Sequence, residues 1–370
     1  ILTPLAVAQQ IHREAQRFGY RSAVIRSAED VIDGINICNY DRLHLIDPKQ
    51  FGSVSLDESS ILKNFGGKTS RALIEAFANC RFRLSASATP APNDHMEIGQ
   101  HAEFCGVMNS NEMLSRFFIN DTSQASQQWR LKRHGVDAFW DWMASWTRMA
   151  QLPSDLGGSD VGYDLPAPQI IRHRASELPP RVTGGLFGDE IVSATNVHDI
   201  KRYTSAARAA SVAEIVTGNS EPWVIWTDTD YEADAVRTAL EGVPSVGEVR
   251  GSHTAQRKES TLAAFADGSL RILISKPSVT GFGLNWQHCA HTAFMGRSFS
   301  YEAWYQAVRR FWRFGQQRIV QVHLIVAEGE ESIARVIDRK ASEHQSMRVA
   351  MRAAMKRNNA AAAETKVAYN

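Results

Sequence analysis

The most informative stretch of the chain is Val54-Ser55-Leu56-Asp57-Glu58-Ser59-Ser60-Ile61-Leu62-Lys63-Asn64. Its short apolar run is typical of a buried strand, and the run ends in two adjacent carboxylates, Asp57 and Glu58. Ligands of open α/β sheets bind beyond the carboxyl ends of the strands, so acidic residues there are placed for chemistry. The alternative is that both carboxylates only cap the following segment, as acidic residues do near helix starts.

Two other segments carry related signals. Arg83-Leu84-Ser85-Ala86-Ser87-Ala88-Thr89-Pro90 is predicted to be a strand ending in Ser-Ala-Thr-Pro, and Gln306-Ala307-Val308-Arg309-Arg310-Phe311-Trp312-Arg313-Phe314-Gly315-Gln316 lies far downstream. The DE pair, the SAT triplet and the Q-x-x-R-R-x-x-R-x-G-Q run resemble, in this order, motifs II, III and VI of superfamily 2 helicases. The segments LDESSILKN, SATPAPND and KPSVTGFGLNWQHC most resemble those of phage and prophage Swi/Snf-type helicases. The resemblance covers roughly residues 1–340.

The resemblance implies an α/β protein with two RecA-like parallel-sheet domains and a helical insertion, using ATP and Mg²⁺. It implies that Asp57 holds Mg²⁺ and that Glu58 is the general base for the attacking water. Arg310 and Arg313, three apart on an expected helix over 301–313, would act as arginine fingers. Arg309 is offset on that helix and is expected to pair with a carboxylate, and the alternative for all three is surface salt bridging. The other implied catalytic and nucleotide-binding residues are Gln306, Gly281 and Gly283.

Ser87 and Thr89 follow a strand that would neighbour the DESS strand. Their hydroxyls are expected to bond Asp57 or Glu58 and to couple the nucleotide site to DNA; the alternative is a cap of the turn before Pro90. The residues implied to bind DNA, expected to be double-stranded and read without sequence preference, are Thr3, Asn39, Tyr40, Thr227, Lys276 and Ser278. Ordinary strand-end or turn roles remain the alternative for these positions, as does a simple glycine turn for Gly281 and Gly283.

A phosphate-binding loop is missing from its expected place. Gly66-Gly67-Lys68-Thr69 resembles such a loop, but a Walker A motif needs a glycine where Leu62 stands and a strand before it. In the family the loop lies upstream of the segment that begins this chain. We therefore expect the chain to start after that loop and, by itself, to bind ATP poorly and to show no DNA-stimulated ATPase.

The predicted organisation is a first lobe over 1–100, a helical insertion and linker over 101–168, a second lobe over 169–345, and a basic helix end with a frayed, Ala-rich tail over 346–370. Residues 136–149 carry aromatic and apolar side chains at helical spacing. Such a stripe is typical of a packed core, with a base-stacking surface as the alternative. Residues 169–200 are expected to be irregular and to include a hairpin.

Composition limits the class of protein. Hydrophobic residues are 44% and charged residues 22% of the 370, as in a soluble globular chain, and the net charge of +1 gives no global basic field. The four cysteines have no C-x-x-C spacing, which argues against zinc and for free thiols in a reducing cytoplasm, of bacterial or phage-infected cells. No apolar run reaches membrane-spanning length. Two alternatives remain open: a non-catalytic DNA-binding remnant or scaffold, and a Mg²⁺ nuclease that uses Asp57 and Glu58.

Overall fold

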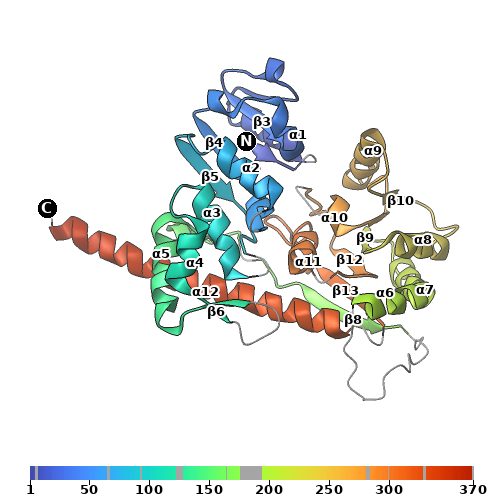
Figure 1. The fold of residues 1–370 in the computed structure, drawn as a ribbon. Helices are drawn as coiled ribbons and strands as arrows, with labels where there is room; N and C mark the ends of the chain where they lie inside the picture. Colours follow the sequence, from blue (N-terminus) through green and yellow to red (C-terminus); the bar gives the residue numbers. More distant parts are fainter. Residues whose placement is uncertain are drawn as a thin grey trace. The chain divides into compact units, whose positions relative to one another are not determined.

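The computed structural model describes residues 1–4, 7–64, 67–91, 94–121, 128–163, 165–175, 194–280, 284–298, 300–327 and 331–368. The chain forms two compact units (Figure 1), one from Ile1–Ser159 with Lys340–Asn370 and the other from Asp160–Arg339. Each unit contains a parallel sheet with flanking helices, which confirms the predicted α/β class with parallel sheets and is consistent with RecA-like domains.

The sheet of the first unit has five parallel strands in the order β2-β3-β1-β4-β5. In this order the strands are Ser22–Val24, Ile35–Asn39, Leu2–Thr3, Ser53–Asp57 and Phe82–Ala86. Helices α1 (Ala8–Arg17) and α2 (Lys68–Ala76) flank it. Apolar residues that alternate along the strands, such as Leu2 and Leu56, form the core, so the polar residues that follow them gather at the carboxyl edge.

Three short helices and a two-stranded antiparallel ribbon complete the first unit. They are α3 (Ile98–Phe104), α4 (Ser110–Phe117), α5 (Val136–Trp146), β6 (Phe118–Asp121) and β7 (Gln128–Leu131). Phe139, Trp140 and Met143 of α5 are buried in one cluster with Met347 and Met351 of α12 (Glu331–Ala368). The aromatic stripe therefore belongs to a core.

The expectation of a frayed tail was wrong for the backbone, because α12 continues to Ala368. Two contacts with α5 hold the helix where the tail was expected to begin. Arg357 forms an ion pair with Asp141 at 2.6 Å, and the Asn358 side chain donates to the Asp141 carbonyl at 3.1 Å. The alanines that follow are strong helix formers.

The second unit has a sheet of six parallel strands in the order β10-β11-β9-β12-β13-β8. These are Val246–Val249, Ile272–Ser275, Trp223–Trp226, His291–Phe294, Gln321–Val326 and Gln169–Arg174. Its helices are α6 (Ala194–Tyr203), α7 (Ser205–Thr217), α8 (Asp230–Ala239), α9 (Ala255–Ala266), α10 (Pro277–Thr280) and α11 (Tyr301–Val308). Strands β9 and β11 are buried along their whole length, as expected for a parallel sheet covered on both faces.

The expected hairpin within 169–200 is wrong for its first part. Gln169–Arg174 forms β8, an edge strand that pairs in parallel with β13, and its ladder begins where the Gln169 amide donates to the Val320 carbonyl at 2.8 Å. The partner strand lies about 150 residues away in sequence, so local periodicity cannot identify the pairing. Residues 176–193 lie outside the described residues.

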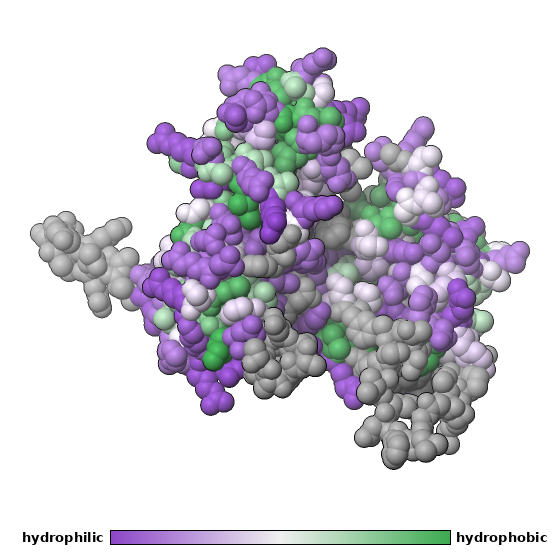
Figure 2. Space-filling view, viewed as in Figure 1, coloured by the Kyte–Doolittle hydropathy of each residue, from purple (hydrophilic) through white to green (hydrophobic). Residues whose placement is uncertain are grey.

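The face of the molecule drawn in Figure 2 is mainly hydrophilic. Within the described ranges, no helix combines the length and the apolar character needed to cross a bilayer. All four cysteines are free.

Candidate functional site

Two hydroxyl groups hold Asp57 at the end of β4. Thr3, which is 0% exposed at the end of β1, donates its hydroxyl to Asp57 Oδ2 at 2.8 Å. Tyr40 donates its phenol to the backbone carbonyl of Asp57 at 2.7 Å. Burial raises the pKa of Tyr40, and the charges of Asp57 and Glu58 raise it further, so the phenol stays a donor. The Asp57 side chain is thus fixed from the neighbouring strand β1, and its main chain from the segment that follows β3.

Glu58 has an unusual backbone conformation. Its φ of 52° and ψ of 51° lie in the left-handed region, which only a second non-glycine residue, Ser245, also enters among the described residues. The turn joins β4 to the short 3-10 helix Ser59–Lys63. A strained residue of this kind costs about 1–3 kcal/mol and is found preferentially at functional sites.

The Asp57–Glu58 pair suits a hard cation by its chemistry, because carboxylate oxygens are the ligands that Mg²⁺ prefers. The described residues contain no cluster of three or more His, Cys, Asp or Glu side chains that could hold a metal. Any Mg²⁺ held by Asp57 would therefore take its remaining ligands from water and from phosphate oxygens, as this ion commonly does.

The predicted coupling residues have a local contact. The Thr89 amide donates to Ser87 Oγ at 3.1 Å, which is a turn of the kind weighed as the alternative. Thr89 is also fully buried. A coupling role for Ser87 and Thr89 stays a prediction.

A buried histidine, His101, connects the segment after β4 with the segment after β5. Ser85 Oγ lies 2.9 Å from Ser59 Oγ and 2.6 Å from His101 Nδ1. His101 Nε2 lies 3.0 Å from the Pro90 carbonyl, which can only accept, so Nε2 carries the proton and Nδ1 accepts from the Ser85 hydroxyl. Burial lowers the pKa of His101 to about 4, so the ring is neutral at neutral pH. Nothing in the sequence around His101 signals this contact.

Three residues predicted to bind DNA lie at this same edge of the first sheet. Thr3 and Asn39 are paired across β1 and β3, and the Asn39 side chain accepts from the Asp41 amide at 3.4 Å. Thr3 and Tyr40 both contact Asp57, as described above. Their DNA role stays a prediction.

The segment that resembles a phosphate-binding loop leads into a helix. Lys68 and Thr69 are the first residues of α2, and the nearest preceding element that the structure describes is the 3-10 helix Ser59–Lys63, not a strand. A Walker A loop follows a strand, so this segment lacks the required context.

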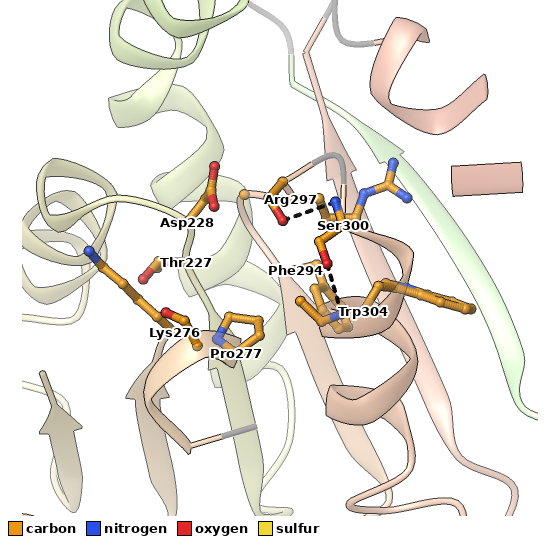
Figure 3. A pocket seen from close by; sticks show the side chains of 12 residues that line it. Thr227, Asp228, Lys276, Pro277, Phe294, Arg297, Ser300 and Trp304 are labelled. Carbon is orange, nitrogen blue, oxygen red and sulfur yellow. Dashed lines mark hydrogen bonds between the residues drawn. The ribbon is translucent and has the colours of Figure 1, made fainter. Parts of the chain in front are cut away.

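The other three predicted DNA-binding residues line one pocket in the second unit (Figure 3). The pocket lies at the carboxyl ends of β9, β11 and β12 and at the beginning of α11. Its twelve lining residues are Thr227, Asp228, Lys276, Pro277, Ser278, Phe294, Gly296, Arg297, Ser298, Ser300, Ala303 and Trp304. Strand β9 lies between β11 and β12 in the sheet, where the chain changes direction, and ligands of parallel sheets bind at such switch points.

Two residues that line this pocket carry buried donors without partners in the described part of the chain. Thr227 is 0% exposed, and among the described residues neither its Oγ1 nor the Nε1 of Trp304 has a hydrogen-bond partner. Lys276 adds a cation, paired with Asp230 at 2.9 Å. Buried polar atoms are normally satisfied, so an unsatisfied hydroxyl beside a lysine indicates a place for an oxygen-rich anion.

Arg310 and Arg313 do not lie on one helix, contrary to expectation. Helix α11 ends at Val308, and both arginines lie in the tight turns that follow. The Trp286 amide donates to the Arg310 carbonyl at 3.0 Å, and this tertiary bond takes the acceptor that a continuing helix would use.

Arg309 was also placed wrongly. Its guanidinium lies over the Trp312 ring, 5.0 Å from the centroid, and within the described part of the chain it forms no ion pair with a carboxylate. Gln306 is buried on α11. Gly281 and Gly283 lie outside the described residues.

Comparisons with known proteins add little to this geometry. No protein-family model and no curated protein matches the sequence. Among solved structures, the crystal structure of the C-terminal part of the Fun30 ATPase domain is similar at 17% identity and a TM-score of 0.32. The match covers 39% of this chain and 52% of that one, so it spans about half of the Fun30 fragment. This weak likeness carries none of the functional argument.

Proposed function

We propose that the protein is an ATP-dependent DNA translocase or helicase of the Swi/Snf type, with ATP and Mg²⁺ as cofactors and double-stranded DNA as partner. The observation that supports it best is the pocket in the second unit. Thr227 comes from one strand end and Lys276 and Ser278 from another, so three residues that the resemblance implies for DNA binding line one pocket.

The chemistry of this pocket favours the phosphate backbone over bases. A hydroxyl, an ammonium group and an indole N–H are donors suited to phosphate oxygens. Contacts of this kind position a protein on DNA but carry no sequence information. We therefore expect duplexes of unrelated sequence to bind with similar affinity.

The nucleotide half of the proposal rests on the Asp57–Glu58 turn. Asp57, fixed by Thr3 and Tyr40, would hold Mg²⁺, and Glu58 would accept the proton of the attacking water. Arg310 and Arg313 would stabilise the charge that develops on the transferred phosphoryl group. The Mg²⁺ would supply charge neutralisation at the phosphates when bound.

The test measures duplex binding by fluorescence anisotropy over a range of salt concentrations. The affinity should fall steeply as salt rises, because each neutralised phosphate releases counterions. Lys276→Met should weaken binding and reduce the magnitude of the salt slope by about one. Arg237→Met on α8, at an exposed position away from the pocket lining, removes the same charge and serves as the control.

Affinity that does not change with salt would contradict the DNA-binding half. For the catalytic half, in a form of the protein that hydrolyses ATP with DNA stimulation, Glu58→Gln should keep duplex binding and abolish that turnover, since an amide cannot accept the proton. If every form of the protein binds duplex DNA but none of them hydrolyses ATP, the non-catalytic DNA-binding alternative is favoured.

A further inference from the structure

The pocket of the second unit has two walls that come from different strands. One wall is Thr227 and Asp228, which follow β9, and the other is Gly296 and Arg297, which follow β12. Figure 3 shows Asp228 and Arg297 on these two segments. Strands β9 and β12 are neighbours in the sheet, but their ladder ends at Trp226 and Phe294, so other contacts must set the distance between the walls.

The first such contact is made by Lys201 of α6, which is only 4% exposed. Its ammonium group donates to Asp228 Oδ2 at 2.7 Å and to the Arg297 carbonyl at 2.6 Å. One buried cation therefore contacts both walls. Lys201 is absent from the pocket lining, so its ammonium group binds acceptors of the protein rather than a ligand in the pocket.

The second contact is a fully buried ion pair, Arg208 of α7 with Glu232 of α8, at 2.9 Å. Arg208 also donates to the Met295 carbonyl, next to one wall, and to the Lys201 carbonyl at 2.6 Å. Glu232 accepts from the Asp228 amide at 2.8 Å, in the other wall. The Arg208–Glu232 pair therefore also contacts the segments that form both walls of the pocket.

Gly296 shows how closely the walls fit the ion pair. A Cβ atom at this position would lie 2.2 Å from a Glu232 carboxylate oxygen, so no side chain is accommodated without displacing the carboxylate. The sequence carries one signal of this arrangement: the capping box of Thr229 and Glu232 at the start of α8.

We propose that Lys201 and Arg208 are positioning residues of the phosphate pocket, which hold its two walls at the separation that a phosphate group requires. The inference rests on the proposed function, because it assumes that the pocket binds the DNA backbone. A buried charge is costly unless it is well bonded, and two such cations behind one pocket are retained here with good geometry. Their effect is preorganisation: the donors of the pocket do not have to be ordered when DNA binds.

The proposal makes a prediction whose sign differs from simple electrostatics. Asp228 is a carboxylate at the rim of an anion site, so removing its charge should strengthen DNA binding if long-range charge alone matters. If Asp228 instead anchors Lys201 between the walls, Asp228→Asn should weaken DNA binding. Lys201→Met should weaken it as well, although Lys201 is buried.

The experiment measures duplex affinity by anisotropy for Lys201→Met, Asp228→Asn and the double variant, with Arg237→Met as the control for the positive charge that Lys201→Met removes. We expect each single variant to lose about tenfold in affinity, and the double variant to lose no more than the worse single one, because both remove the same contact. Arg208 is left intact, since loss of a fully buried partner endangers folding.

Hydrogen exchange supplies a readout that does not depend on DNA. In Lys201→Met the amides of residues 227–229 and 295–297 should both exchange faster than in the parent, while the β10–β11 ladder should not change. Unchanged exchange in both segments, or tighter DNA binding by Asp228→Asn, would overturn the proposal. Absence of duplex binding by the parent chain would overturn the proposed function, and the exchange result would still decide whether Lys201 holds the walls.

Discussion

Arg310 and Arg313 donate to the same acceptor, the carbonyl oxygen of Leu284, at 3.0 and 3.3 Å. Arg310 is 5% exposed. Burial, together with the nearby charge of Arg309, lowers the pKa of Arg313. Two guanidinium groups thus share an oxygen that carries only a partial charge. A phosphate oxygen, which carries a full charge, is the stronger partner for such donors.

This sharing predicts a non-additive pair of substitutions. In Arg310→Met or Arg313→Met the Leu284 carbonyl keeps one donor, whereas in the double variant both donors are lost. We expect the double variant to lose about 1–3 kcal/mol more unfolding free energy than the sum of the single losses. Urea denaturation measures all three, and Arg309→Met, which removes the contact with Trp312, should combine additively with Arg310→Met. Additive losses at Arg310 and Arg313 would show that the shared carbonyl is unimportant.

Thr3 provides a prediction about Asp57. Thr3→Val keeps the shape of a fully buried side chain but removes the hydroxyl that donates to the carboxylate. A hydrogen bond to a charged group contributes about 1.5–3 kcal/mol, so thermal or urea unfolding should show a loss of that order. Thr3→Ser keeps the donor and is the matched control. If Val is tolerated better than Ser, the hydroxyl does not hold Asp57.

The backbone of Glu58 predicts a difference between two substitutions that both remove its carboxylate. Glu58→Gly and Glu58→Ala should be equally inactive in ATP hydrolysis, but the glycine variant should be the more stable by about 1–2 kcal/mol, because only alanine keeps a Cβ in the left-handed region. Their urea midpoints give the comparison. Equal stability would mean that the strain is relieved in solution.

His101 predicts a pH dependence of stability. Its pKa is lowered to about 4 by burial, so the unfolded chain binds this proton at higher pH than the folded one does. The contribution is therefore complete above pH 6.5, falls as the pH is lowered, and reaches a loss of about 3 kcal/mol near pH 4. Unfolding free energy measured between pH 7 and 4 should fall less steeply in His101→Gln, whose amide can still bond Pro90 and Ser85.

The pH-dependent contributions of the other histidines to the unfolding free energy cancel in that comparison, because the parent and the variant both keep them. They include His323, whose pKa burial also lowers to about 4. Identical slopes in the parent and in His101→Gln would show that the ring is accessible to protons without unfolding.

Most of the strands could be predicted because their signal is local. The strands Ser53–Asp57 and Trp223–Trp226 carry apolar residues over strand length, and the polar residues Asp57 and Thr227 stand at their carboxyl ends, which is the pattern of a buried parallel strand. The gathering of Thr227, Lys276 and Ser278 could be expected for the same reason, since the carboxyl ends of parallel strands meet at one edge.

The partners of the site residues could not be predicted in this way. Thr3 bonds Asp57 across 54 residues, and Lys201 reaches Asp228 across 27 and Arg297 across 96. The Trp286 amide takes the Arg310 carbonyl just beyond the end of α11, although the sequence of 301–313 is suited to a longer helix.

By itself, the sequence determined most of the strands of the two parallel sheets and which polar groups end at the ligand-binding edges, because side-chain periodicity is a property of neighbours. Tertiary structure alone decided which hydroxyl holds Asp57, that α11 ends before Arg310, and which buried cations contact the pocket walls. The physical reason is that a hydrogen bond forms only when its donor and acceptor atoms lie within about 3 Å of each other. Only the packed register of distant strands and helices brings those particular atoms so close.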